Sequence, residues 1–480
     1  MNTLGVLAAL ALHGFASFGF GRFALRRTGH ASASAALSVA LGLAMVVVMG
    51  GALNLMRAAA RPSPFVVLGV GTALALTAIP WRTLAQTQLA LRSEAGVYGL
   101  LCLLALLLCA TILPTPTFNY YDDLQKYFAH PVRMLQTGTL RGSSLSALGF
   151  ETLGGQAYLH GFVLSLGQID MLHAADCVFA FLLLLALLGT APSERAAPRW
   201  LAMAAAALIN PQIVNVSATY TAAALGAALV LMQLDAKAGS TGSAVLAGIV
   251  LAALCALKSS LALYALTLGL SLSAARVACA GWLQCARWSG VCAGTTCACV
   301  APWVLVHVPN LQLIAQHRSP VASPSLAAAY SMEPFSWESW GYGTGFAPYT
   351  YALLALCALA ALAFWHTRPR SHVLQVSLWL AVGLALLYVC MLYAIGPVSQ
   401  GELTMLRLFA PMLIGALPAL YVLLSEALTG RSRRAFTLVA VLSIAPLLAF
   451  VPFSLERAQR ALLDGSVFVV ARLDQAPWYR

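Results

Sequence analysis

Charged side chains are scarce in this sequence, and acidic side chains are the scarcest. Asp and Glu together supply 15 of the 480 residues, all charged residues make up 9%, and hydrophobic residues make up 61%. A soluble core of this size needs much less apolar surface, so the scarcity of charge excludes an ordinary soluble protein. We expect a chain that is solvated largely by lipid.

Several motifs that would assign a function are also missing. The phosphate-loop spacing G-x-x-x-x-G-K-[ST] is absent. No single basic face or nucleic-acid reader motif accompanies the net charge of +12, so nucleic acid is not an expected partner. The N-terminal stretch lacks the positive n-region and the A-x-A site of a cleaved signal peptide, and it predicts a retained first helix.

The eleven cysteines show no secreted-type disulfide framework, and most of them lie inside or beside apolar runs. Cys297 and Cys299 have a C-x-C spacing with Cys292 upstream, but no His or Cys stands at zinc-site spacing from them. We therefore predict that these cysteines pack inside helices, and we predict no metal site from them.

Apolar runs of membrane-spanning character recur along the chain. They cover approximately residues 3–20, 35–56, 65–81, 96–113, 174–191, 200–217, 219–234, 243–259, 261–275, 289–306, 348–365, 373–395, 405–425 and 435–453. The pattern predicts an all-α, polytopic integral membrane protein with about 11–14 transmembrane helices. The count is a range because several runs are short, and the two runs around Lys258 also fit one long helix plus a re-entrant piece.

Loop charges predict the orientation of these spans. The cations in alternate loops are Arg22, Arg26, Arg27, Arg82, Arg92, Arg195, Arg199, Lys237, Arg276, Arg287, Arg368, Arg370, Arg431, Arg433 and Arg434. All of them fall on one side if the N-terminus is outside, and the positive-inside rule makes that side cytoplasmic. Arg57 and Arg61 are the exception, on a short loop that is predicted to face outward. We expect a multi-pass protein of the bacterial inner membrane.

The opposite, extracytoplasmic face receives the long loops 114–173 and 307–347 and the tail after residue 454. Eleven of the fifteen acids map to this face: Asp122, Asp123, Glu151, Asp170, Asp176, Glu333, Glu338, Glu402, Glu456, Asp464 and Asp474. The polar chemistry is therefore expected outside the cytoplasm, where nucleotide sugars and ATP are not available. We divide the chain into N-terminal helices 1–95, which form an add-on module, a membrane core 96–425, and a last helix with its tail, 426–480.

The first long loop opens with two adjacent acids, Asp122 and Asp123, among aromatic residues at the end of an apolar span. Carboxylates at a membrane surface are costly to keep, so they mark a general base or a metal ligand. Apolar residues three or four apart follow them and predict an amphipathic helix in the plane of the interface, interrupted or bent near His130-Pro131. A purely structural role for this helix fits the same pattern. Gly138 and Gly142 then break this helix.

Other side chains are candidates for binding a substrate. Glu151 is a second carboxylate in the first long loop and His160 a candidate partner, although a single histidine there is more often structural. Lys258 and Arg407 lie at the ends of spans near the outer leaflet, where a phosphate headgroup needs such donors. An anchor for the helix end is the alternative role of each. In the second long loop, Glu333 and Trp337 combine acid and aromatic groups, as sugar-binding surfaces do, but an interfacial aromatic belt fits equally well.

The arrangement resembles the GT-C class of polytopic glycosyltransferases, which includes protein mannosyltransferases and aminoarabinose transferases. The resemblance rests on Asn119-Tyr120-Tyr121-Asp122-Asp123 at the end of a span, on the interfacial helix with Tyr127 and Gly138, on Lys258, and on Arg407-x-x-x-Pro411. It covers roughly residues 96–425. In the family the acidic loop usually follows the first helix and usually carries Asp-Glu, whereas here Asp-Asp follows about the fourth span.

The resemblance implies an enzyme that transfers a sugar from a polyprenyl-phosphate donor to an extracytoplasmic lipid, glycan or protein. Asp122 or Asp123 would be the catalytic base, and Tyr121 together with the candidates above would bind substrate. No metal ligands are assigned, and a divalent metal that bridges an acid and the phosphate stays open. The alternatives are an O-antigen polymerase or ligase, in which arginines dominate catalysis, and a transporter or lipid flippase.

Overall fold

The computed structural model describes residues 3–30, 33–78, 99, 103, 127–142, 152–166, 172–189, 202–203, 206, 217–234, 239–317, 372–395 and 409–419. Every regular element among these residues is helical, which confirms the predicted all-α class. The helices are α1 (Thr3–Arg27), α2 (Ala35–Leu55), α3 (Pro62–Ala78), α6 (Ala129–Thr137), α7 (Gly155–Leu166), the π-helical η5 (Ala174–Ala180), α8 (Phe181–Gly189), α10 (Thr219–Gln233), α11 (Thr241–Leu257), α12 (Ser259–Ala280), α13 (Trp282–His317) and α17 (His372–Ile395).

Five stretches of the described chain are long and apolar enough to cross a membrane. They are Gly5–Arg27, Ala35–Leu55, Ser260–Ala280, Trp282–Pro309 and His372–Met391. Shorter apolar helices occupy Pro62–Ala78, Ala174–Gly189, Thr219–Leu234, Thr241–Leu257 and Phe409–Ala419. Each of these ten coincides with a predicted span, so the helical membrane protein is confirmed. The predicted spans 96–113, 348–365 and 435–453, and nearly all of 200–217, lie outside the described residues.

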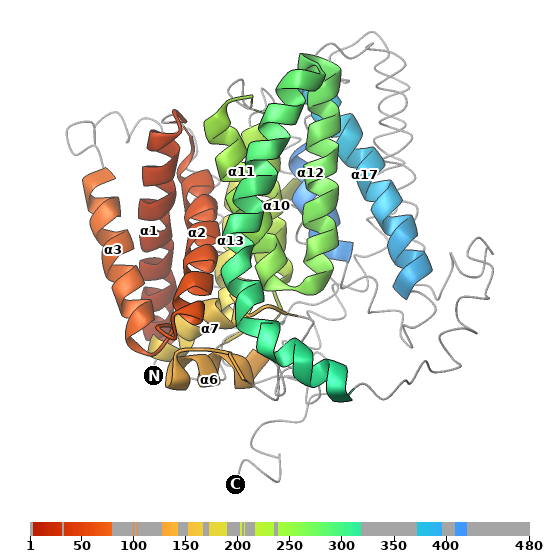
Figure 1. Ribbon diagram of the computed structural model, residues 1–480. Helices are drawn as coiled ribbons and strands as arrows, with labels where there is room; N and C mark the ends of the chain where they lie inside the picture. The colour runs from red at the N-terminus through yellow and green to blue at the C-terminus, as the bar shows by residue number, and fades with distance from the viewer. Residues whose placement is uncertain are drawn as a thin grey trace, which may run out of the picture.

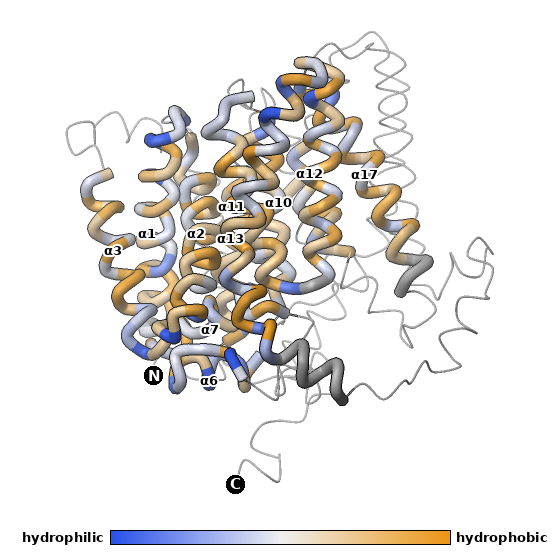
Figure 2. Tube along the Cα trace, viewed as in Figure 1, coloured by the Kyte–Doolittle hydropathy of each residue, from blue (hydrophilic) through white to orange (hydrophobic). Residues whose placement is uncertain are grey.

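The bundle has two distinct ends (Figure 1). At one end, which we call the α6 end, α6 and α7 lie beside the first turn of α1, where Val6 joins a small apolar cluster with Tyr127 and Val163. The other end holds Arg276, near the end of α12, and we call it the Arg276 end. There the Arg26 guanidinium donates to the carbonyl oxygen of Ala78 at 2.6 Å. Hydrophilic positions concentrate toward both ends, and apolar positions fill the middle of the tube (Figure 2).

Small residues allow the first three helices to pack very closely. A methyl group added at Gly42 of α2 would lie 1.7 Å from the carbonyl oxygen of Ser17 in α1. One added at Gly19 would lie 2.0 Å from the carbonyl oxygen of Gly71 in α3. Helices surrounded by lipid gain little from hydrophobic burial against one another, so close backbone approach through small residues is how they associate.

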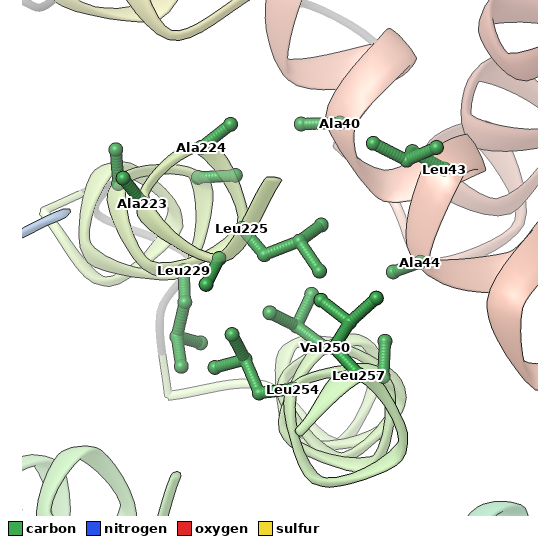
Figure 3. Packing of buried hydrophobic residues seen from close by; sticks show 14 of the residues in the cluster. Ala40, Leu43, Ala44, Ala223, Ala224, Leu225, Leu229, Val250, Leu254 and Leu257 are labelled. Atoms are coloured by element: carbon green, nitrogen blue, oxygen red, sulfur yellow. The ribbon is translucent and has the colours of Figure 1, made fainter. Parts of the chain in front are cut away.

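The core is centred on α10, every residue of which is buried. Ala224 and Leu225 of α10 lie beside Ala40 of α2, and Leu229 lies beside Leu254 of α11 (Figure 3). A helix that is apolar on all sides belongs inside a bundle and not at its surface. Because α2 belongs to this same core, the N-terminal helices pack directly on the central ones; the division at residue 95 stays a prediction.

At one boundary the structure confirms the predicted separate spans, and at another it differs from the prediction. Lys258 is a single extended residue (φ −158°, ψ 143°) that separates α11 from α12, so the two runs around it are separate helices. The second long loop was predicted from residue 307, whereas α13 continues to His317. Pro302 and Pro309 lie inside α13. The prediction stopped too early because polar residues replace apolar ones there, although the backbone stays helical.

Candidate functional site

The helix that was predicted to follow the acid pair is present as α6, and it lies across the end of the bundle (Figure 1). Its α-helical part begins at Ala129, directly after the π-helical residues Tyr127 and Phe128. Because residues 121–126 lie outside the described part of the chain, the predicted interruption or bend near His130-Pro131 stays a prediction. Pro131 falls in the first turn, where the backbone N–H groups have no partner within the helix and proline is tolerated. Gly138 ends the helix in the left-handed conformation (φ 77°), as predicted for a helix breaker.

The turn between α2 and α3 holds α6 in place. The amide of Ala59 donates to the carbonyl oxygen of Gly138 at 3.0 Å, and the amide of Arg61 donates to that of Leu135 at 3.0 Å. The buried Asn54 side chain accepts from the amide of Leu140 at 2.8 Å. These three bonds fix the depth and direction of the helix that directly follows the acid-pair segment in the chain.

The segment Thr152–Gly154, which leads into α7, is fastened to two other helices. The Thr152 hydroxyl donates to the carbonyl oxygen of Leu257 in α11 at 2.9 Å. His307 of α13 lies 2.8 Å from the carbonyl oxygen of Leu153 through its Nε2 atom. Gly154 has φ 112°, and a methyl group there would lie 2.9 Å from the Trp303 ring. Residues far apart in sequence therefore converge at the α6 end.

Lys258 belongs to this convergence. It directly follows Leu257, whose carbonyl oxygen accepts the Thr152 bond, and its side chain is partly buried. Glu151 directly precedes Thr152 in the sequence, but it lies outside the described residues. The structure thus brings one predicted cation to the segment that follows one predicted acid.

His160 lies in the interior of α7 and is completely buried. Its Nε2 atom lies 3.1 Å from the Gln156 side-chain amide, and the Tyr127 ring meets its ring edge-on at 6.4 Å between centroids. Burial lowers the pKa of His160 to about 4; the nearby His173 also lowers it, and the backbone of Tyr127 opposes the change. The imidazole ring is therefore neutral near pH 7. Its contact with Tyr127 packs α7 against the residues that directly precede α6. A substrate contact for it stays a prediction.

Asp176 has a structural partner that the sequence did not indicate. Its carboxylate accepts from the amides of Tyr220 at 3.0 Å and Thr221 at 2.8 Å, and from the Thr221 hydroxyl at 2.8 Å. These amides belong to the first turn of α10, whose N–H groups lack partners within the helix. Asp176 is therefore a tertiary cap of α10, and an acid in an otherwise apolar helix was the only signal available.

Apart from Asp176, the described charges at the α6 end are positive. They are Arg57, Arg61, Arg133, Arg141 and Lys258. Asp176 is the one acid among all described residues, and it is committed to α10. Arg57, which the orientation pattern left unexplained, has φ 58°, and its carbonyl oxygen faces Gly138 so closely that a methyl group there would lie 2.1 Å away. Its backbone thus helps to position α6.

At the Arg276 end, buried polar side chains form hydrogen bonds with one another. The Arg276 guanidinium donates to the Gln233 side chain, whose amide donates to the Ser243 hydroxyl at 3.2 Å. The same guanidinium lies 4.1 Å from the centre of the Trp288 ring. These buried groups join α10, α11, α12 and α13 to one another, and the α6 end is the better candidate for chemistry.

Most predicted site residues lie outside the described part of the chain. They are Tyr121, Asp122, Asp123, Glu151, Glu333, Trp337 and Arg407. Within the described ranges, no group of three or more His, Cys, Asp and Glu side chains is placed to hold a metal ion. Cys292 and Cys297 have free thiols and line a largely apolar cavity of about 340 Å³ together with Cys255. Comparison of the chain with protein-family models, curated proteins and solved structures gives no match.

Proposed function

We propose that this protein is a membrane glycosyltransferase that moves a sugar from a polyprenyl-phosphate donor to a lipid, glycan or protein acceptor outside the cytoplasm of a bacterium. The observation that carries the proposal is the anchored helix α6. It directly follows the segment with Asp122 and Asp123, it lies across one end of an apolar bundle, and three hydrogen bonds fix it there. An acid pair leading into such a helix is suited to work at the level of a lipid headgroup.

The positive charge at the α6 end also supports the proposal. A donor of this kind carries a phosphate that must be bound and then released with its lipid chain. Lys258 lies at this end, and it adjoins the segment that follows Glu151. Cations placed where charge develops in the transition state stabilise a departing phosphate.

The proposed reaction is a single displacement. The carboxylate of Asp122 or Asp123 takes the proton of an acceptor hydroxyl, and the acceptor oxygen forms a bond with the anomeric carbon of the sugar. The bond between that carbon and the phosphate oxygen breaks, and the lipid phosphate leaves with the electron pair. Lys258 and Arg407 stabilise the phosphate. Tyr121, Glu151, His160, Glu333 and Trp337 remain candidates for holding the sugar and the acceptor.

The test is transfer of a labelled sugar from lipid-linked donor by membranes that contain the Asp122→Asn or Asp123→Asn variant. We expect one of the two to lose at least about a hundredfold in rate, which is the contribution of a positioned base. Asp474→Asn removes a carboxylate from the C-terminal tail and serves as the matched control. Full transfer by both loop variants, at expression equal to that of the control, would reject the proposal.

A second candidate is a polymerase or ligase of lipid-linked glycans, in which arginines carry the catalysis. Four arginines at the α6 end favour this second enzyme. Arg57 and Arg61 belong to the turn between α2 and α3, which is bonded to the segment that contains α6 and carries Arg133 and Arg141. For this enzyme Arg133→Gln and Arg141→Gln would abolish glycan extension, whereas Asp122→Asn and Asp123→Asn would leave it intact. Transport of a lipid-linked sugar by purified protein in liposomes, without glycosyl transfer, would exclude both enzymes.

A further inference from the structure

A groove of about 430 Å³ lies between α3, α6 and α7 at the α6 end, and none of the predicted site residues lines it. Its polar lining comes from Arg61, Gln136 and Ser165, and its apolar lining includes Phe65, Leu135 and Leu164. One cavity therefore combines a cation with apolar walls, at the level of the bundle where an interfacial helix lies. A ligand that fits it needs a charged head and an apolar body.

Arg61 is the charged group of this groove. Its backbone amide is fixed by the carbonyl oxygen of Leu135 at 3.0 Å, which holds the start of its side chain beside α6. The side chain is exposed, and within the described ranges its guanidinium has no carboxylate to pair with, since Asp176 is bound to α10. The Ser165 hydroxyl donates to the carbonyl oxygen of Gly161, so Arg61 and Gln136 supply the donors for an anion.

The apolar part of the groove continues along the outside of α3. Phe65 is 49% exposed, and Val66 and Val70 of the same helix are 61% and 50% exposed. Apolar side chains that stay this exposed on a membrane helix face acyl chains and not water. The cation and the lipid-facing apolar surface therefore meet at the first turn of α3, whose helix dipole adds positive potential there.

We propose that this groove binds one anionic glycerophospholipid of the surrounding bilayer. The phosphate accepts hydrogen bonds from the Arg61 guanidinium and the Gln136 amide, and the acyl chains lie against Phe65 and Leu164. A planar guanidinium binds phosphate through two parallel bonds, which distinguishes it from the other groups of the groove. The bound lipid joins α3 to α6 and α7. The inference does not depend on the sugar-transfer reaction.

The test measures retention of phosphatidylglycerol and of phosphatidylcholine by the full-length protein in neutral detergent, with native mass spectrometry as the readout. We expect Arg61→Gln to weaken phosphatidylglycerol binding about tenfold, the value of a charged hydrogen bond to phosphate, and to weaken phosphatidylcholine binding less, because the choline cation of that headgroup offsets the attraction of its phosphate to Arg61. Arg141→Gln is the matched control, because it removes the same charge from an exposed residue at the same end but outside the groove.

Ser165→Phe gives a second, charge-neutral variant that fills the groove, and we expect it to lower phosphatidylglycerol binding as well. It keeps the test valid if Arg61→Gln does not fold. Equal loss of binding in Arg141→Gln would overturn the proposal, because net charge would then explain the effect. Unchanged binding in Ser165→Phe, or complete displacement of the lipid by millimolar inorganic phosphate, would overturn it too, since the apolar walls would then contribute nothing.

Discussion

The cap that Asp176 forms on α10 gives the sharpest prediction for stability. Replacing Asp176 with alanine leaves two backbone N–H groups and one hydroxyl buried without an acceptor, at the start of the helix that forms the centre of the core. Each orphaned buried group costs about 1–3 kcal/mol. Because the three groups share one site and relax together, we expect a loss of about 3–5 kcal/mol for Asp176→Ala, toward the lower end of their summed cost.

Two milder variants test whether the carboxylate acts through these bonds. Asp176→Asn keeps one neutral acceptor oxygen, so we expect about half of the alanine effect. Thr221→Val removes only the hydroxyl bond and is expected to cost about 1 kcal/mol. Thr77→Val removes a threonine hydroxyl bond at an exposed position of α3 and should change almost nothing.

Thermal unfolding of the purified protein in detergent, followed by tryptophan fluorescence, measures this series. At about 2 °C per kcal/mol, the lower end of the range for domains of 150–250 residues, Asp176→Ala should unfold roughly 6–10 °C below the wild type. The order of the transitions is the decisive result: wild type, then Thr221→Val, then Asp176→Asn, then Asp176→Ala. If Asp176→Ala unfolds at the wild-type temperature, or above Thr221→Val, the capping argument is refuted.

Three further predictions concern the packing of the helices and the buried histidine. Gly138→Ala should detach α6 and raise its cleavage by protease, whereas Gly142→Ala, at another left-handed glycine with open space around it, should cost only about 1 kcal/mol. Gly42→Ala should lower the unfolding temperature because its methyl group meets a neighbouring backbone, whereas Gly69→Ala, which faces open space, should raise it slightly through helix propensity. Folding lowers the pKa of His160 from 6.5 to about 4. The unfolded chain therefore binds a proton that the folded protein does not, and the free energy of unfolding falls by about 1.4 kcal/mol per pH unit between pH 6.5 and pH 4. His160→Gln should remove that part of the pH dependence, as measured by unfolding at fixed pH values. Equal behaviour within either glycine pair, or an unchanged pH profile in the histidine variant, would contradict these predictions.

Features set by local sequence were predicted best. Apolar runs gave the helical membrane class and the positions of the spans, because lipid requires every backbone group to bond within its own helix. Gly138 was correctly expected to end α6, since its left-handed conformation is a local property of the chain.

Features set by contacts between distant residues were not predictable. Nothing near Asp176 in the sequence indicates that its partners are Tyr220 and Thr221, because that pairing exists only after η5 and α10 pack together. The contact of Thr152 with Leu257 is equally remote in sequence. The candidate acids and Arg407 lie outside the described residues, so their convergence with Lys258 remains a prediction.

The charge distribution of the two ends distinguishes structural from catalytic roles for the acid pair. At the Arg276 end, the Arg276 guanidinium contacts the neutral Gln233 side chain and the Trp288 ring. At the α6 end, the four arginines have no described acid available, and Asp122 and Asp123 belong to a segment that leads into this end in the sequence. If Asp122 and Asp123 served only to balance these arginines, changing them to Asn would destabilise α6 and lower activity in proportion. If one of them is the base, its Asn variant must lose transfer while α6 stays resistant to protease, and that separation of activity from stability decides between the two roles.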